Sequence, residues 1–112
     1  MTINDLLLQL RNASDTIDFK DVIQVISQFY DYTPTRFTNG TLVNVAGSNE
    51  GSCKIFYFAQ LQQLNEKHTL ALFGRYYRED VLANPRGKDH NNIRNFMDTG
   101  WTELKFDGVA LA

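Results

Sequence analysis

A run rich in glycine and asparagine, Asn39 to Lys54, separates two helical patterns and limits what this chain can fold into. Its sequence is NGTLVNVAGSNEGSCK, and it contains the only cysteine of the 112 residues. Asn39-Gly40 stands between two short runs of β-forming residues, 36–38 and 41–45, a pattern that predicts a small β-hairpin. The loop that follows ends where the most apolar helix pattern of the chain begins, so the fold must combine helices with a hairpin.

Helical periodicity dominates the chain before this run. Thr2 and Asp5 form a capping-box pattern ahead of a short amphipathic helix. Asp18 is the expected N-cap of a second helix with one continuous apolar stripe. This helix must end before Pro34, because the residue that precedes a proline is disfavoured in the α region.

Three more helices and a strand are expected after the run, over residues 49–64, 69–81, 89–100 and 101–106. Thr69 and Asp89 are the expected caps of the last two helices, and Gly100 the residue that ends the last one. Gly74 indicates close packing by a neighbour or a short break. The strand needs a partner, which only the hairpin supplies. We therefore predict one compact α+β domain over residues 1–112, mostly helical with about five helices and a small antiparallel sheet.

Composition excludes several classes of protein. The chain is 43% hydrophobic, which is enough for a core without disulfides. Eleven basic and thirteen acidic residues give a formal charge of -2, and no basic run is present, so nucleic-acid binding is disfavoured. The apolar runs are too short to span a bilayer, and the N-terminus lacks a basic leader. A lone cysteine fits a reducing compartment. We expect a cytoplasmic monomer that contacts neither nucleic acid nor membrane.

Four segments of the chain resemble one known family, the HopJ type III effector family: YDYTPTRFTNG, NVAGSNEGSCK, FGRYYREDVLANPRG and DHNNIRNFMDTGW. The resemblance covers nearly the whole chain. It implies a bacterial protein with a compact mixed α/β fold and no agreed catalytic activity. The name of the family comes from a plant-pathogen effector delivered into host cells, so secretion by a type III system is the alternative to a cytoplasmic location. Since the first helix pattern begins at about Ile3, without a Ser-rich export segment, we expect the cytoplasmic one.

Cys53 and His90 are the candidate catalytic residues. Cys53 falls in the first turn of a predicted helix, where backbone N–H groups and the helix dipole lower a thiol pKa. His90 is a possible base, with Asn91 or Asn92 nearby to orient it. This pair favours a cysteine-dependent hydrolase or transferase. The alternative is a packed cysteine, because free cysteine is among the most buried residue types.

A second group of residues is typical of ligand binding: Asn44, Asn49, Ser52, Lys54, Arg78 and Arg94. Arginine forks and a helix start both suit carboxylate or phosphate. The expected partner is a small anionic ligand, or a protein or peptide, bound at the 44–54 loop. In the alternative, the arginines pair with nearby Glu79, Asp80 or Asp98, and the asparagines stabilise turns.

Metal binding is not expected. Asp89-His90 offers two ligands, but a site needs further ones, His68 is the only other histidine, and neither HxxxH nor CxxC occurs. No cofactor motif is present either, since the spacing of a Walker A loop is missing. The sequence thus favours a non-enzymatic binding module, with the cysteine-dependent enzyme and the secreted effector as alternatives.

Overall fold

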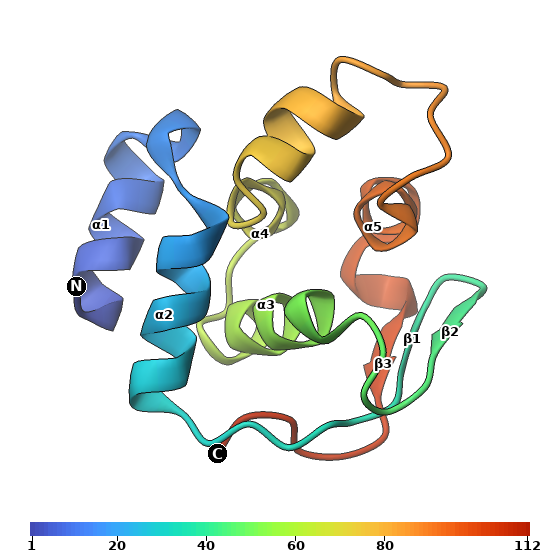
Figure 1. Ribbon diagram of the computed structural model, residues 1–112, viewed down its shortest axis with the longest axis horizontal. Helices are drawn as coiled ribbons and strands as arrows, with labels where there is room; N and C mark the ends of the chain where they lie inside the picture. Colours follow the sequence, from blue (N-terminus) through green and yellow to red (C-terminus); the bar gives the residue numbers. More distant parts are fainter.

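Figure 1 shows the structure, a computed structural model that describes all 112 residues. Five α-helices, one π-helical segment and a three-stranded antiparallel sheet build it, which confirms the predicted α+β class. In chain order the elements are α1 (Ile3–Asn12), η1 (Ser14–Thr16), α2 (Phe19–Phe29), β1 (Phe37–Asn39), β2 (Leu42–Asn44), α3 (Glu50–Leu61), α4 (Glu66–Ala71), the π-helical η2 (Tyr76–Val81), α5 (Asn91–Thr99), η3 (Gly100–Glu103) and β3 (Leu104–Phe106).

Helix α3 runs through the middle of the molecule, with α1 and α2 on one side and the sheet and α5 on the other (Figure 1). Four of its side chains are fully buried: Ile55, Phe56, Phe58 and Ala59. The Phe56 ring packs against Phe37 of β1, Phe73, and Phe96 of α5, with ring centroids 4.9 to 6.2 Å apart. The most apolar helix pattern of the sequence is therefore the centre of the core.

The first two helices begin where the sequence predicts. The Thr2 side chain accepts from the Asp5 N–H, and the Asp5 carboxylate accepts from the Thr2 N–H, so the capping box is complete. Asp18 caps α2. Beyond α2 the chain is extended, and the backbones of Asp31 and Ala112 exchange hydrogen bonds of 2.9 and 3.1 Å, which ties the C-terminus to this segment.

The predicted hairpin and its third strand are present, in the order β2-β1-β3. The turn, however, is formed by Gly40 and Thr41 rather than by Asn39-Gly40, and only Gly40 has a positive φ, +61°. Asn39 is a fully buried strand residue. Its side-chain amide donates to the backbone oxygen of Asn92 in α5, and this partner explains the one-residue shift.

The expected strand over residues 101–106 is too long, since only Leu104–Phe106 pairs with β1. The preceding residues form the 3-10 segment η3. Two hydrogen bonds hold Trp101 in this conformation: its backbone N–H donates to the Glu66 carboxylate, and its indole N–H donates to the Leu64 carbonyl.

The expected helix over residues 69–81 starts earlier and is interrupted, and the close packing and short break that Gly74 indicates are confirmed. Asn65, not Thr69, caps α4, and the chain breaks at Gly74 before η2 begins. Gly74 has φ +61°, and a Cβ there would lie 2.9 Å from the backbone nitrogen of Phe19 and 3.0 Å from the carbonyl oxygen of Ile17. The positive φ interrupts a right-handed helix, and the close contact leaves no room for any side chain at this position.

Helix α5 starts one residue later than expected. Its N-cap is His90, and Asp89 accepts from Arg94 instead of capping the helix. Asn49, the first residue of the expected helix over residues 49–64, occupies the N-cap position of α3. Gly100 ends α5 with φ +60°, as predicted.

Candidate functional site

A cleft of about 420 Å³ opens between the first turns of α3 and α5. The two helix starts contribute Asn49, Gly51, Ser52, Asn91, Asn92 and Ile93. One wall is formed by the aromatic side chains of Phe19, Phe73 and Tyr76, together with Leu42. The charged rim consists of Lys88, Asp89 and His90. The cleft therefore collects segments that are far apart in the sequence.

Neither α3 nor α5 has a side-chain cap at its N-terminus, the end that borders the cleft. Asn49 and His90 occupy the two N-cap positions, and both have left-handed backbones, with φ 50° and 51°. Neither side chain accepts a hydrogen bond from its helix start. The first N–H groups of a helix have no acceptor within the helix. The N–H groups of residues 50–52 and 91–93 can therefore donate hydrogen bonds to a ligand.

The aromatic wall depends on a glycine. A Cβ at Gly51 would lie 2.9 Å from Cζ of Phe19, so only glycine admits this ring against the start of α3. Tyr76 packs edge-on against Phe19, with centroids 5.1 Å apart, and against the His90 ring at 5.2 Å. The wall connects α2 to the rim and gives one side of the cleft an apolar surface.

Behind the cleft lies an asparagine network, formed by the buried Asn39, Asn44 and Asn92 and the exposed Asn49. Asn44 and Asn92 exchange amide hydrogen bonds of 3.2 and 2.8 Å, and Asn49 donates to Asn44 at 2.7 Å. Asn39 donates to the side-chain and backbone oxygens of Asn92, while its own Oδ1 has no partner. The network joins both hairpin strands to α5, and it leaves only Asn49 and Asn92 at the cleft wall.

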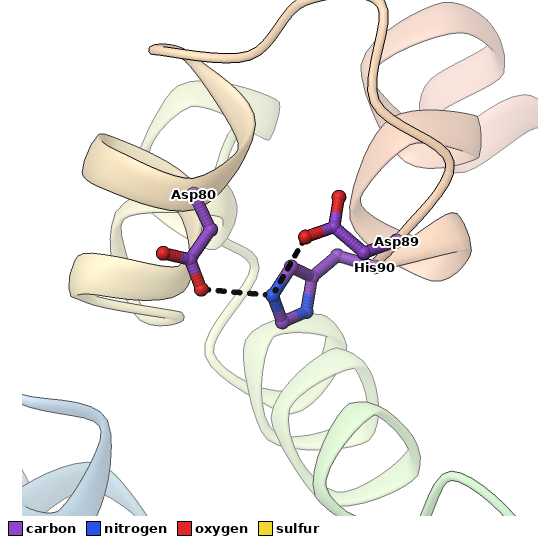
Figure 2. Close-up of side chains that lie close together, drawn as sticks. All are labelled: Asp80, Asp89 and His90. Atoms are coloured by element: carbon purple, nitrogen blue, oxygen red, sulfur yellow. Dashed lines mark hydrogen bonds and ion pairs between the residues drawn. The ribbon is translucent and has the colours of Figure 1, made fainter.

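At the rim, the side chains of Asp80, Asp89 and His90 converge, and we call them the rim cluster (Figure 2). Nε2 of His90 lies 3.0 Å from Asp80 Oδ2 and 3.8 Å from Asp89 Oδ2. A hydrogen bond from Arg94 lowers the pKa of the Asp89 carboxyl, which keeps it ionised at neutral pH. Negative charge therefore faces the imidazole from two directions.

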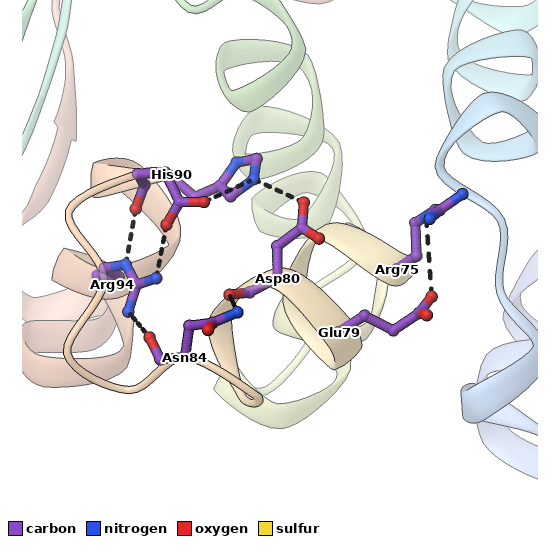
Figure 3. A network of polar contacts seen from close by, with 7 residues as sticks. Arg75, Glu79, Asp80, Asn84, His90 and Arg94 are labelled. Carbon is purple, nitrogen blue, oxygen red and sulfur yellow. Dashed lines mark hydrogen bonds and ion pairs between the residues drawn. The ribbon is translucent and has the colours of Figure 1, made fainter.

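Arg94 fixes the loop that connects η2 to α5, residues 82–90, which we call the rim loop (Figure 3). Its Nε and Nη2 donate to the backbone oxygen and Oδ1 of Asp89, both at 2.6 Å, and Nη1 donates to the Asn84 carbonyl at 2.8 Å. The Asn84 amide in turn donates to the Asp80 carbonyl at 3.1 Å. Arg94 does not line the cleft. It pairs with an acidic residue, as the structural alternative predicts, but with Asp89 rather than Asp80 or Asp98.

The Arg78 side chain also makes a structural hydrogen bond. Its Nη1 donates to the backbone oxygen of Ile17 at 2.9 Å, which ties η2 to the segment before α2. Lys54 lies over the Tyr32 ring, with its Nζ 4.6 Å from the centroid. Neither residue lines the cleft.

Cys53 is buried, and its thiol lies 3.7 Å from the Thr35 carbonyl oxygen. Burial raises its pKa, so the expected lowering by the helix start is wrong. His90 has its polar contacts with Asp80 and Asp89 instead. The structure shows no contact that joins Cys53 to His90.

Of the residues that the sequence singles out, the structure brings Asn49, Ser52 and His90 together in the cleft. It adds Lys88 to the cleft and Asp80 to the rim cluster, both of which sequence reasoning missed as site residues, and it places Asn91, expected only to orient His90, in the lining. One signal pointed to Asp80: the turn sequence Asn84-Pro85-Arg86-Gly87 reverses the chain, so residues shortly before and after it can face each other.

Residues 3–111 match the profile of the HopJ type III effector protein family. The chain belongs to this family. The HopJ fold is also seen in a crystal structure of VPA0580, described as a protein of unknown function, which is 48% identical to this chain. The two superpose with a TM-score of 0.98, over 100% of this chain and 93% of the other. The recognition of the HopJ family from sequence segments is thus confirmed.

Two further searches, one among curated proteins and one for membrane-spanning helices, gave negative results. No curated protein matches the chain. No helix of the structure combines the length and apolarity that a membrane-spanning segment needs.

Proposed function

We propose that this HopJ domain binds a small anionic ligand in the cleft between the first turns of α3 and α5. The observation that carries the proposal is a cleft into which two helices of 12 and 9 residues both open without a side-chain cap. The ligand-binding residues are then Asn49, Ser52, Lys88 and Asn91, with the free N–H groups around them.

The electrostatics of the cleft favour an anion. Each helix start carries the equivalent of roughly half a positive charge, and two starts around one space add their fields. Lys88 supplies a positive charge that offsets the negative charge of Asp89 at the rim, so the helix starts decide the preference, and the Ser52 hydroxyl can donate one hydrogen bond more. The wall formed by Phe19 and Tyr76 excludes water on one side, which strengthens these interactions.

Size narrows the class of ligand. A volume of about 420 Å³ lies in the range of pockets for single small molecules, roughly 300 to 1,000 Å³. A phosphate ester or a short carboxylic acid with an apolar part fits both the helix starts and the aromatic wall. The cysteine-dependent alternative has no geometric support, since the thiol of Cys53 lies outside the cleft.

An NMR titration tests this proposal. Inorganic phosphate is added to ¹⁵N-labelled protein at constant ionic strength, and amide shifts are followed. We expect saturable shifts concentrated at residues 50–52 and 91–93. Lys88→Gln should weaken the affinity several-fold, whereas Lys67→Gln, an exposed lysine of α4 that does not line the cleft, should match the parent protein. Shifts scattered over the surface, or equal effects of both variants, would contradict the proposal.

Family membership favours a second candidate, a secreted effector. The protein with its native N-terminus would be exported from a strain with a functional type III apparatus and retained in a strain that lacks one. Secretion that is equal in both strains, or absent from both, counts against this candidate. Ligand binding in the cleft is compatible with either result.

A further inference from the structure

We propose that Asp80, Asp89 and His90 together bind a divalent transition-metal ion, such as Zn²⁺, at the rim of the cleft. This inference goes beyond the anion site, because the three side chains bring their own ligand atoms. It also changes the expectation from the sequence, in which no third ligand could be found.

The ligand atoms are already close to the arrangement of a metal site. His90 Nε2 and the two carboxylate oxygens all lie within 4.8 Å of one another, with Nε2 3.0 and 3.8 Å from the oxygens. Ligands of one tetrahedral Zn²⁺ lie about 3.3 to 3.5 Å apart, since each is about 2.0 to 2.2 Å from the ion. Shifts of roughly 1 Å at exposed side-chain ends would complete the geometry.

A proton alone does not account for this arrangement. Both carboxylates point to the same nitrogen of His90 (Figure 2). A hydrogen on that nitrogen would serve Asp80 at 3.0 Å and leave the Asp89 oxygen, at 3.8 Å, beyond hydrogen-bond reach, whereas without it the nitrogen has a lone pair for a metal ion. A dication coordinates all three atoms at once.

The surroundings hold the three ligands in place. Arg94 binds the other oxygen of Asp89 at 2.6 Å, and Tyr76 packs against the His90 ring. Asp80 lies in the π-helical segment η2, whose Leu82 N–H bonds back to the Tyr77 carbonyl at 3.0 Å. Such segments are rare and frequent at functional sites, and orientation by outer contacts is typical of metal ligands.

The ligand set indicates which metal would bind. One imidazole nitrogen with two carboxylate oxygens suits Zn²⁺ and its neighbours such as Mn²⁺ and Fe²⁺, whereas Mg²⁺ and Ca²⁺ prefer oxygen alone. The His90 and Asp80 side chains are 28% and 39% exposed, so an ion can enter from solvent. Asp89 and His90 also line the cleft, and three protein ligands leave a coordination position open.

Isothermal titration calorimetry of chelator-treated protein with Zn²⁺, in a buffer without phosphate, tests the proposal. We expect one ion per chain. Asp80→Asn and His90→Gln should each weaken binding at least about 100-fold, because each removes a ligand. The matched controls Asp98→Asn and His68→Gln change an exposed carboxylate and the other histidine, and should bind Zn²⁺ like the parent. Parent-like affinity of Asp80→Asn and His90→Gln would overturn the proposal.

A second readout requires no variant. The chain has two histidines, so their ring protons are resolved by NMR. Zn²⁺ should shift the His90 ring and leave His68 unchanged, and the same concentration of Mg²⁺ should shift neither. Equal shifts of both rings, or none, would contradict the metal site. Because phosphate is absent, the result does not depend on whether the cleft binds anions.

Discussion

The asparagine network and the rim cluster both connect to the start of α5, yet they differ in charge, in burial and in how their polar atoms are paired. In the network, neutral amides donate to one another at 2.7 to 3.2 Å, and Asn39, Asn44 and Asn92 are at most 6% exposed. In the rim cluster, two carboxylates compete for one imidazole nitrogen at the surface. The first arrangement fixes the hairpin on α5 and leaves one buried acceptor, Asn39 Oδ1, unpaired, while the second leaves Asp89 Oδ2 without a donor at the surface.

Physical chemistry explains why each arrangement stands where it does. A buried amide must find its partner within the protein, because an unpaired one costs roughly 1 to 3 kcal/mol. An exposed carboxylate is solvated, so an incomplete set of contacts costs little there. The network should therefore matter for stability, and the rim cluster for binding.

The largest expected effect is that of Asn92→Ala. This change leaves the amides of Asn39 and Asn44 without their shared partner, and we expect the free energy of unfolding to fall by about 3 kcal/mol. Urea denaturation measures it. The neighbour Asn91 is exposed, so Asn91→Ala should cost less than about 0.5 kcal/mol. Similar losses for the two variants would show that the network is not structural.

Arg94→Gln comes next. It removes donors from the carbonyl oxygens of Asn84 and Asp89, and the expected loss in unfolding free energy is about 1 kcal/mol. The control is Arg75→Gln, since the Arg75 side chain is 71% exposed and its ion pair with Glu79 is long, at 3.7 Å. Equal stability of the two variants would mean that Arg94 does not hold the rim loop.

The pH dependence of Asp89 gives a smaller effect. Its pKa is lowered in the folded protein, mainly by the hydrogen bond from Arg94. A lowered carboxyl pKa stabilises the fold above the unfolded value, about 3.9, and this contribution disappears as the pH falls through the folded value. The parent protein should therefore unfold at higher urea than Asp89→Asn at pH 7, with a gap that narrows below about pH 4. A gap that stays constant down to pH 2 would contradict this cause.

The smallest effect is expected for Asp80→Asn. Because Asp80 is partly exposed and Asn keeps a similar shape, the unfolding free energy should change by less than about 0.5 kcal/mol in the absence of metal. Thermal unfolding with and without Zn²⁺ extends the comparison, since only the parent should be stabilised by the ion. If Asp80→Asn were as damaging as Asn92→Ala, the rim cluster would be structural as well.

Local signals in the sequence were sufficient for much of the fold. Thr2 and Asp18 cap their helices with their own side chains, and Asn39-Gly40 between two β-forming runs predicts the hairpin, which in turn supplies the partner that the strand near the C-terminus needs. The break at Gly74 was not predictable in detail, since it depends on the backbone of Ile17 and Phe19 more than fifty residues away.

The site was harder to predict for the same reason. Asn39 and Asn92 are 53 residues apart, and no local pattern shows that their amides meet. Cys53 and His90 are catalytic candidates by residue type alone. In the structure, burial raises the pKa of the Cys53 thiol, and the His90 imidazole faces two aspartates. Asp80 was considered only as an arginine partner, because its approach to His90 depends on how the rim loop closes.

Anion binding in the cleft between α3 and α5 can be tested in crystals of the protein soaked in arsenate. Arsenate has the shape and charge of phosphate, and arsenic can be located by its anomalous scattering. We expect an arsenic peak in the cleft, within about 4 Å of the backbone nitrogens of residues 50–52 and 91–93, since the arsenate oxygens would accept hydrogen bonds from these N–H groups. Arsenic peaks found only on other surfaces, with an empty cleft, would contradict it.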